Sequence, residues 1–381
     1  FIHFSVASLT HDLFLCKESK QYTHAILNPP YKKISSASPY RLALRNVGIE
    51  TVNLYPAFVA LAVAQLACGG QLVAIIPRSF CNGPYYRPFR EYILKHTAIR
   101  NIHLFASRKK AFKDDGVLQE NIIIRLERGG QQGPVTISTS TDDLFDDLVT
   151  HVYPFSQIVP SDNDEQFIHI PASPHCTSIE CPSTIRYTLD ELNICVSTGP
   201  VVDFRLKDYL CHLPKEGTVP LIYPAHLHQT ETTWPIPTLK KPNAIVHNQI
   251  TERWLFPSGY YCVVRRFSSK EERRRIVASV VTPMAFSGYP VLGFENHVNV
   301  FHDNKQGLHE WIARGLAIFL NATSVDEKFR CFNGHTQVNA TDLRRMKYPS
   351  RNTLEQLGKW AAQQTKITQE MIDDQLEKLT L

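Results

Sequence analysis

The sequence predicts an α/β protein in which a mostly parallel sheet is followed by a second, α+β domain. Over the first 130 residues, short apolar strands alternate with helical stretches, which is typical of a parallel sheet with helical connections. After Gly129 the composition shifts to Gly, Gln, Ser, Thr and Asp, and from residue 184 short β-like runs stand among many prolines. We therefore expect two domains with different architectures.

Length and composition restrict the classes of protein that remain. The 381 residues, 43% of them hydrophobic, can bury a large core and suggest two or three domains of ~100–200 residues each. Lys and Arg number 41 against 36 Asp and Glu, so the net charge is only +5 and nucleic-acid binding would need a local basic patch. No apolar run reaches the ~18 residues that a membrane helix requires. The nine cysteines form no CxxC pair, so a zinc ribbon is unsupported and reduced thiols are expected.

The strands and helices of the first domain are predicted from apolar runs and from the residues that end them. The alternation predicts strands at 1–6, 24–27, 71–76, 99–105 and 121–126 and helices at 52–68 and 85–96. Gly69 and Gly70 are expected to end the first of these helices in the C-terminal cap position. Strands that alternate with helices in this way place their chemistry at the strand ends.

The rest of the chain is less regular. Residues 130–165 and 171–183 are interpreted as the interdomain connection. Beyond them the pattern predicts short strands at 220–223, 244–247, 260–264 and 298–301, and helices at 307–320 and 353–379. We expect a first domain over 1–165, a second over 166–350 and a C-terminal helix over 351–381.

One tetrapeptide carries chemistry. Asn28-Pro29-Pro30-Tyr31 directly follows the strand at 24–27, where an α/β sheet places a catalytic loop. An exocyclic amine on a ring is a poor nucleophile because its lone pair is delocalised. The Asn28 side-chain oxygen and the Pro29 carbonyl, held by consecutive prolines, can each accept one N–H of such an amine and steer its lone pair towards a methyl donor. Tyr31 offers a flat face on which the base can stack. The alternative is a proline-rich turn with a packed tyrosine.

This loop and its surroundings resemble the adenine-N6 DNA methyltransferases of restriction–modification systems, specifically the gamma-type arrangement of the Taq methyltransferase and its relatives. Segments 53–58 and 69–77 match the helix and strand that follow the loop in that family. The resemblance implies a partial Rossmann-like methyltransferase sheet followed by a target-recognition domain. It also implies methyl transfer from S-adenosyl-L-methionine to adenine N6 in double-stranded DNA, with the target base flipped out.

The resemblance also assigns further residues and partners. Asp12, within His11-Asp12-Leu13-Phe14-Leu15, is similar to the acidic residue that holds the adenine of S-adenosyl-L-methionine, and Asn28 lies on the cofactor side as well. Phe112 stands where the family places an aromatic on the other face of the extruded base, with a plain core aromatic as the alternative. We expect a cytoplasmic bacterial or archaeal protein whose cognate restriction endonuclease is a separate polypeptide.

Basic residues flank the predicted site. Lys32, Lys33 and Arg41 follow the loop, Arg78 follows the next strand, and Lys110 and Lys113 surround Phe112. Each is a candidate for contacts with DNA phosphates. For Lys32, Lys33 and Arg41 the alternative is a solvated loop, and for Arg78 it is a structural ion pair.

The second half contains two segments, 196–205 and 334–343, that resemble parts of the family's target-recognition domain, although physical reasoning assigns them no role. Arg265-Arg266, Lys240-Lys241 and Arg344-Arg345 could reach phosphates or read guanine, or could lie on a solvated surface. His335, Gln337 and Asn339 could contact bases or brace a domain interface.

The chain departs from the family in one respect. The glycine-rich cofactor loop and the acidic residue that clamps the cofactor ribose are expected before Phe1, and no GxGxxG occurs in the sequence. Either about 100 residues precede this chain, judging by domain sizes, or it is a degenerate copy. The intact Asn28–Tyr31 loop favours the first explanation.

Three functions therefore remain in view. The first is adenine-N6 methylation of DNA. The second keeps the loop but changes the acceptor to cytosine N4 or a protein glutamine. The third is a catalytically silent DNA-binding specificity module.

Overall fold

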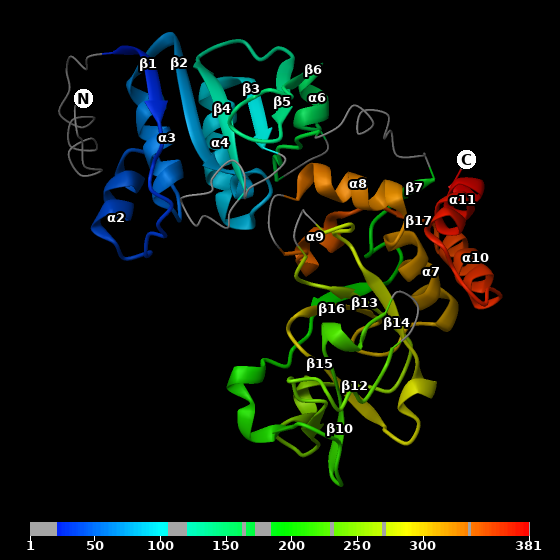
Figure 1. The fold of residues 1–381 in the computed structure, drawn as a ribbon. Helices are drawn as coiled ribbons and strands as arrows, with labels where there is room; N and C mark the ends of the chain where they lie inside the picture. Colours follow the sequence, from blue (N-terminus) through cyan, green and yellow to red (C-terminus); the bar gives the residue numbers. More distant parts are fainter. Residues whose placement is uncertain are drawn as a thin grey trace. The chain divides into compact units, whose positions relative to one another are not determined.

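The structure, a computed structural model, describes residues 21–105, 120–161, 165–171, 184–228, 232–268, 272–333 and 337–380. The chain divides into two compact units (Figure 1). The first unit comprises Phe1–Ser178 with Cys331–His335, and the second comprises Ile179–Arg330 with Thr336–Leu381. The domain boundaries predicted at residues 165 and 350 separate functions, so they differ in kind from the division into compact units and stay predictions.

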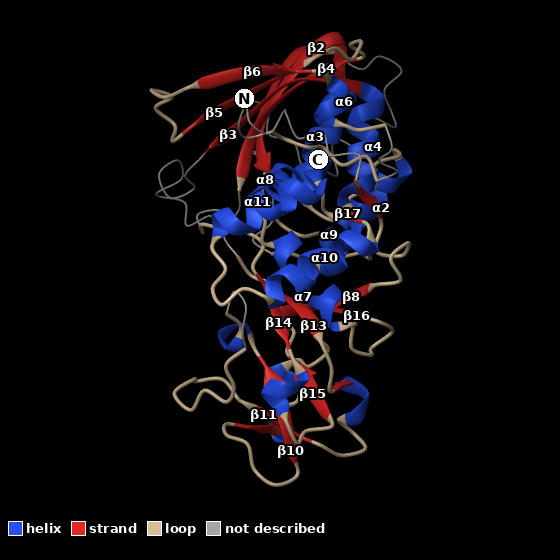
Figure 2. Cartoon of the chain, turned by 90° about the vertical axis from the view of Figure 1, so that its right-hand side faces the viewer, coloured by secondary structure: helices blue, strands red, loops and turns tan. Residues whose placement is uncertain are grey.

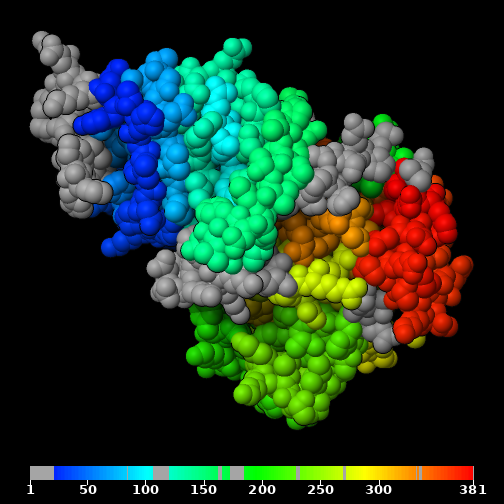
Figure 3. All heavy atoms as spheres, turned by 45° about the horizontal axis from the view of Figure 1, so that its top comes forward, coloured from blue at the N-terminus to red at the C-terminus, as the bar shows by residue number. Residues whose placement is uncertain are grey.

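The first unit is built on a six-stranded sheet with the order β1-β2-β4-β3-β5-β6. Its strands are β1 (Tyr22–Leu27), β2 (Leu66–Pro77), β3 (Thr97–Phe105), β4 (Asn121–Arg128), β5 (Val135–Ser140) and β6 (Val149–Tyr153). The strands predicted around 24–27, 71–76, 99–105 and 121–126 are all present, whereas the strand expected at 1–6 lies outside the described residues. In the space-filling view of Figure 3, atoms of the first unit's strands, coloured blue to green, are visible at the surface that faces the viewer.

The described sheet is mixed, and the prediction of a mostly parallel sheet does not hold for it. β1 pairs with β2, and β3 with β5, in parallel. β4 runs antiparallel to both β2 and β3, and β6 runs antiparallel to β5. The carboxyl ends of β1, β2 and β3 and the start of β4 therefore meet at one edge, which we call the carboxyl edge of the sheet.

Helices cover one face of this sheet (Figure 2). They are α3 (Leu54–Gln65), α4 (Arg87–His96) and the short α6 (Phe155–Ile158), while α2 (Pro39–Asn46) packs through Leu44 into a smaller cluster with Ile34, Ile49 and Leu61. The main core joins Val59 and Val63 of α3 and Ile93 of α4 to alternate residues of the strands. Since a strand's side chains alternate between faces, this core lies on one side of the sheet.

Two predictions for the first unit are wrong. Gly69 and Gly70 do not cap α3, which ends at Gln65; both lie in β2, where the pairing with β1 slips between Tyr22 and His24. The φ of Gly69 is +78°, so this glycine serves the bulge rather than a helix end. Residues 130–165 are not a connection either, because β5 and β6 within them extend the sheet.

The second unit contains three small sheets. A five-stranded sheet has the order β12-β15-β10-β11-β9, a four-stranded sheet has the order β14-β13-β16-β8, and β17 pairs with β7. The strands are β7 (Ile185–Tyr187), β8 (Cys195–Thr198), β9 (Leu210–Cys211), β10 (Thr218–Ile222), β11 (Ala244–Val246), β12 (Leu255–Pro257), β13 (Tyr261–Arg265), β14 (Ala278–Val281), β15 (Val291–Phe294), β16 (Val298–His302) and β17 (Tyr348–Pro349). The four strands predicted in this half are β10, β11, β13 and β16.

The helices of the second half are α7 (Glu310–Leu320), α8 (Thr323–Phe332), α9 (Ala340–Arg345), α10 (Arg351–Ala362) and α11 (Gln369–Thr380). The long C-terminal helix predicted over 353–379 is instead two helices, α10 and α11, separated by residues 363–368. α10 packs closely on α7, because each helix contributes a glycine at their contact. A Cβ on Gly315 would lie 1.9 Å from the Leu354 carbonyl oxygen, and one on Gly358 would lie 2.0 Å from that of Trp311.

Candidate active site

The Asn28–Tyr31 loop leaves the carboxyl edge of the sheet at the end of β1, as the sequence predicts. β1 lies beside β2 in parallel, with Leu27 opposite Ala74. Pro29 is buried, Tyr31 is half-buried, and Asn28 and Pro30 are exposed. Among the described residues, none hydrogen-bonds to the Asn28 side chain. The buried Pro29 anchors the loop while the Asn28 amide stays accessible.

Tyr31 is held in place by the neighbouring strand and by a second tyrosine. Its hydroxyl donates to the carbonyl oxygen of Ile75 in β2 at 3.3 Å. Its ring meets that of Tyr55 edge to face, with centroids 6.0 Å apart and planes at 83°. Tyr55 is buried near the start of α3, and its hydroxyl lies 3.4 Å from the Ser79 hydroxyl. Burial raises the pKa of Tyr55 well above its usual value, so its hydroxyl stays neutral.

The chain just after the loop is clamped to the segment that begins α3. The Leu54 N–H donates to the Lys32 carbonyl and the Ile34 N–H to the Val52 carbonyl, each at 2.8 Å. Lys33 and Asn53 form an isolated antiparallel bridge between these bonds. The two ends of the Asn28–Tyr31 loop are therefore fixed by β1 and by residues 52–54.

Asn53 connects this clamp to a third tyrosine. Its Nδ2 donates to the hydroxyl of Tyr86, whose ring lies 5.8 Å from that of Tyr55. Its Oδ1 is buried and has no hydrogen-bond partner in the part of the chain that the structure describes. Sequence reasoning found the segment 53–58 but assigned no role to Asn53, Tyr55 or Tyr86. No signal in one sequence could pair Asn53 with a tyrosine 33 residues away.

Buried polar groups gather along the same carboxyl edge. Asn121 opens β4 opposite Pro77, the last residue of β2, and Asn82 follows the short 3-10 helix η1 (Arg78–Cys81). Both asparagines are at most 3% exposed, and both have side-chain atoms that find no hydrogen-bond partner among the described residues. Buried polar groups are nearly always paired, so unpaired ones at a single sheet edge are typical of a functional region.

The basic residues near the loop divide into two groups. Lys32 and Lys33 are exposed and form no ion pair within the described parts of the chain. Arg41 and Arg45 both bind Glu50, and the hydrogen bond from Arg45 is the main cause of the lowered pKa of that carboxyl. Phosphate contacts by Lys32 and Lys33 stay a prediction, whereas Arg41 would have to share its guanidinium with Glu50.

Arg78 lies inside the first unit. Its side chain is 5% exposed, and its Nη1 donates to Glu120 Oε1 at 3.1 Å. Its Nη2 donates to the Cys331 carbonyl at 2.8 Å. The structure therefore contains the ion pair that the sequence analysis considered as the alternative, and a phosphate could reach Arg78 only if this pair opened.

Four predicted site residues lie outside the described residues. They are Asp12, Lys110, Phe112 and Lys113. The described residues that flank the last three, Phe105 at the end of β3 and Glu120 before β4, lie at the carboxyl edge, on which the Asn28–Tyr31 loop also lies. The roles of these four residues stay predictions.

In the second unit, the paired basic residues mostly serve its own backbone. Arg265 donates to the Leu227 carbonyl, Arg344 to the Val196 carbonyl, and Lys241 pairs with Asp203 at 2.8 Å. Asn339 forms a capping box with Asp342 at the start of α9. The solvated-surface alternative is thus wrong for Arg265, which is partly buried, whereas Arg344 is exposed and its contacts with DNA stay a prediction; Asn339 is braced within its own unit. His335 lies outside the described residues.

Other chemistries find little support in the described residues. No group of three or more His, Cys, Asp or Glu side chains within them could hold a metal ion. Burial raises the pKa of the Cys81 thiol to about 12, so this cysteine near the carboxyl edge stays protonated and is no nucleophile. None of the described helices has both the length and the apolar character needed to cross a membrane.

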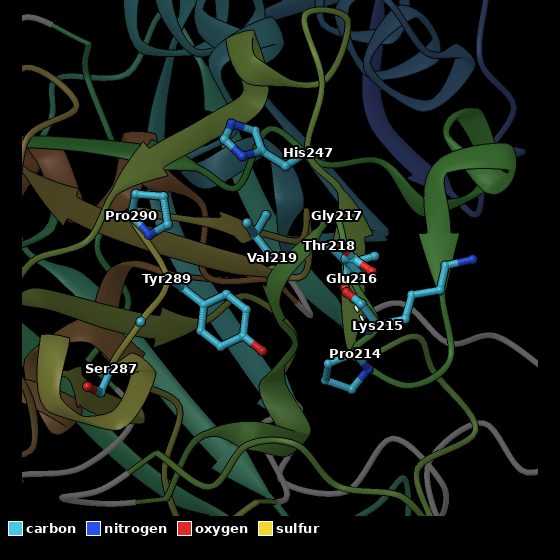
Figure 4. Close-up of a pocket in the computed structure, with 11 residues that line it drawn as sticks. Pro214, Lys215, Glu216, Gly217, Thr218, Val219, His247, Ser287, Tyr289 and Pro290 are labelled. Atoms are coloured by element: carbon cyan, nitrogen blue, oxygen red, sulfur yellow. Dashed lines mark hydrogen bonds between the residues drawn. The ribbon is translucent and has the colours of Figure 1, made fainter.

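A cavity of about 610 Å³ in the second unit lies between residues 214–219, at the start of β10, His247 and residues 287–290. Figure 4 shows the Tyr289 ring in the middle of this group, while the Lys215 side chain extends outwards. The cavity is wide open to solvent and contains none of the predicted site residues.

Comparison with known proteins gives the chain a family. Residues 1–112 match the family model described as Eco57I restriction-modification methylase. The Type II methyltransferase M.BsuBI of Bacillus subtilis is 55% identical over 383 residues, which cover 100% of this chain and 76% of that protein. The Type II methyltransferase M.PstI of Providencia stuartii is 45% identical over 385 residues, covering 99% of this chain and 74% of that protein.

A solved structure shows a similar fold. The Type IIL restriction-modification enzyme MmeI, in complex with DNA, matches with a TM-score of 0.53 at 10% sequence identity, over 98% of this chain and 55% of that one. At this identity the likeness concerns the fold alone. The identities to M.BsuBI and M.PstI over nearly the whole chain decide the assignment: this chain belongs to the Type II methyltransferases of restriction-modification systems.

Proposed function

We propose that the chain carries out site-specific methylation of adenine N6 in double-stranded DNA, as the modification component of a restriction-modification system. The observation that carries this proposal is the Asn28–Tyr31 loop at the carboxyl edge of the sheet, with an accessible Asn28 amide beside an anchored Pro29. The family membership supplies the reaction class, and this loop supplies the chemistry of the acceptor.

The loop orients an amine without forming a covalent bond. The Asn28 Oδ1 and the Pro29 carbonyl would each accept one hydrogen bond from the exocyclic amine of an adenine, so that its lone pair faces the methyl donor. The backbone that carries both acceptors is held before the substrate arrives, because Pro29 is buried and residues 32–34 are clamped to 52–54. Such preorganisation avoids the cost of arranging dipoles during the reaction.

Tyr31 would support the flipped base. Its ring is fixed by the Ile75 carbonyl and by Tyr55 and stays half-exposed. Stacking on an aromatic side chain is worth ~1–3 kcal/mol per base, which offsets part of the few kcal/mol needed to take a base out of the duplex. Phe112 is proposed for the opposite face of the base.

S-adenosyl-L-methionine would supply the methyl group as an electrophile bound to a positive sulfur. The exposed Asn28 amide, which has no partner among the described residues, fits a place between this donor and the base. Asp12 is proposed to hold the adenine of the donor. The exposed Lys32 and Lys33 would contact the phosphates that flank the flipped nucleotide.

Alanine at Asn28 tests the proposal directly. Asn28 is exposed, so the substitution removes an acceptor without opening the core. We expect the transfer of a tritiated methyl group to duplex DNA to fall at least a hundredfold in the full-length protein, because the amine loses one of its two orienting bonds. Asn46→Ala, at an exposed asparagine that ends α2, is the matched control and should keep wild-type activity.

Product analysis separates the alternatives. Digestion of methylated DNA to nucleosides followed by mass spectrometry should yield N6-methyladenine. N4-methylcytosine would replace the proposed acceptor, and labelling of protein glutamine would replace DNA. If the wild-type protein binds DNA selectively but transfers no methyl group, the chain is a silent specificity module. Unchanged methylation by Asn28→Ala would refute the mechanism itself.

A further inference from the structure

Segment 196–205 and the described residues 337–343, which belong to the second unit, both lie close to one turn. This turn, residues 295–297, connects β15 to β16, and the second segment reaches it through Arg266. From the first segment, the Gly199 N–H donates to the Val298 carbonyl and the Val201 carbonyl accepts from the Asn296 N–H. From the second, the Val338 N–H donates to the Arg266 carbonyl, and the Arg266 N–H in turn donates to the His297 carbonyl.

The approach of the first segment is so close that only glycine fits. A Cβ on Gly199 would lie 2.1 Å from the Glu295 carbonyl oxygen. The Glu295 backbone is also fixed by its N–H, which donates to the Ile222 carbonyl at 3.0 Å. The chain therefore brings distant segments together to hold the 295–297 turn in one position.

At the centre of this turn a buried carboxylate holds an exposed histidine. The Glu295 side chain is 0% exposed, and it accepts hydrogen bonds from the His297 backbone N–H at 2.8 Å and from the His297 Nδ1 at 2.6 Å. Within the described residues, no other side chain or backbone group donates to this carboxylate. The His297 side chain is 41% exposed. A buried carboxylate needs such donors, so Glu295 and His297 form an obligate pair.

This pairing decides which nitrogen carries the proton. A carboxylate only accepts, so Nδ1 carries a proton, and whenever the ring is neutral its Nε2 carries the lone pair. Nε2 has no partner among the described residues. With a neutral ring, the turn thus presents a single, oriented hydrogen-bond acceptor at the surface.

The surroundings of His297 suit a nucleic acid. The exposed Phe267 ring lies 4.9 Å from the His297 ring, tilted by 37°. The Arg266 guanidinium lies 5.7 Å from the Phe267 ring, and it is fixed by the Asn296 carbonyl at 3.0 Å and by Gln337 Oε1 at 3.3 Å. An aromatic pair beside an immobilised cation offers flat stacking surfaces and a positive potential to a polyanion.

We propose that His297 is a sequence-reading residue, whose Nε2 accepts a hydrogen bond from the exocyclic amino group of an adenine or a cytosine in the major groove. Those amino groups are the donors that bases present there, and a neutral imidazole matches them. Glu295 is a positioning residue that fixes the ring. The inference rests on the proposed function in so far as the second unit recognises DNA.

The test compares binding preferences without any methyl transfer. A pool of duplexes with randomised sequence is enriched for binding to the full-length protein and to His297→Asn. Asparagine keeps a donor close to the position of Nδ1 for the buried Glu295 but removes Nε2. We expect the variant to lose roughly tenfold preference for adenine or cytosine at one base-pair position and to keep the preferences at all others.

Two controls complete the design. His247→Asn alters another partly exposed histidine of the second unit that also pairs with a glutamate, Glu252, and should leave every preference unchanged. Glu295→Gln should weaken the same position that His297→Asn affects, because a loosened ring reads less sharply. A merely structural pair would instead lower the unfolding temperature and weaken all positions alike.

A second measurement uses the wild-type protein alone. The base identified by the selection is replaced by an analogue without the exocyclic amino group, and affinity should fall about tenfold. Unchanged affinity, unchanged preferences of His297→Asn, or a lost preference for guanine would each overturn the inference. A wild-type protein without any sequence preference in binding would overturn it too. If the protein binds DNA selectively but transfers no methyl group, these binding results can still be interpreted, and only the proposed function is contradicted.

Discussion

Arginine residues show how far a single sequence can predict partners at the scale of one residue. Arg41 and Arg78 were candidates for phosphate contacts because they follow predicted strands or the catalytic loop. Arg41 binds Glu50, nine residues away, and Arg78 binds Glu120, 42 residues away. Neither separation is marked in the sequence, because Arg41 and Glu50 meet only once α2 and the chain after it have folded, and Arg78 and Glu120 meet only at the carboxyl edge of the sheet. The accessible position of the Asn28 amide, by contrast, depends on residues adjacent to it in the chain, so it was predictable.

The Asn53–Tyr86 contact should affect catalysis through the position of the loop. Tyr86→Phe removes the acceptor of the Asn53 Nδ2 and leaves a buried amide unpaired, which costs about 1–3 kcal/mol. Since Asn53 bridges Lys33 just behind the catalytic loop, we expect kcat for methyl transfer to fall about tenfold with little change in DNA affinity. Single-turnover methylation and equilibrium DNA binding measure the two separately.

Tyr92→Phe is the matched control for this prediction. Tyr92 is also partly buried in the first unit, but its hydroxyl donates to the Ala60 carbonyl at 3.2 Å, within the helical layer. It should cost some stability and leave kcat unchanged once the protein is folded. Equal losses of kcat in both variants would show that Tyr86 acts through general stability and not through the loop.

At the scale of elements, apolar runs predicted which strands and helices exist better than they predicted where each one begins and ends. The strands β1 to β4 and the helices α3, α4 and α7 were found because their hydrophobic patterns are strong. The Gly69-Gly70 pair was wrongly predicted to cap a helix, because glycine is equally suited to helix ends and to strand bulges. Only the register between β2 and β1 shows that the pair lies in a bulge. β5 and β6 were missed because their Ser- and Thr-rich sequence resembles a linker until it pairs at the sheet's edge.

The contact between α7 and α10 predicts a stability effect that no hydrophobic pattern reveals. Gly358→Ala would place a Cβ 2.0 Å from the Trp311 carbonyl oxygen, so the helices must separate. Overpacking of this kind typically costs 1–3 kcal/mol, which should appear as a lower urea midpoint of unfolding. Gln356→Ala, at an exposed position of the same helix, should change the midpoint little. A variant Gly358→Ala as stable as the wild type would mean that the two helices do not pack this closely.

At the scale of the whole molecule, the chain crosses between its two units more than once. Residues 331–335 return to the first unit, where the Cys331 carbonyl accepts from the Ile170 N–H at 2.9 Å. The domains predicted over 1–165 and 166–350 are consecutive, because a shift in composition marks only a boundary between consecutive segments. A short return of a few residues leaves no compositional trace.

Buried histidines in both units should make the whole protein sensitive to mild acid. Burial lowers the pKa of His103 in the first unit and of His226 and His302 in the second. At a pH near or below the unfolded value of about 6.5, the unfolded chain then binds more protons than the folded one, so stability falls as the pH drops. We expect the urea midpoint to decrease between pH 7.5 and pH 5.5.

The pH window distinguishes this effect from carboxylate titration, which also lowers stability as the pH falls. Asp203 and Glu50 have lowered pKa values, chiefly through hydrogen bonds from Lys241 and Arg45, and their contribution is lost only below a pH of about 4. His103→Gln, which stays neutral throughout, should reduce the loss between pH 7.5 and pH 5.5, whereas His309→Gln at an exposed histidine should not. A midpoint that is constant or rises over this range would contradict the burial of neutral imidazoles, because each of them can only favour the folded state at the higher pH.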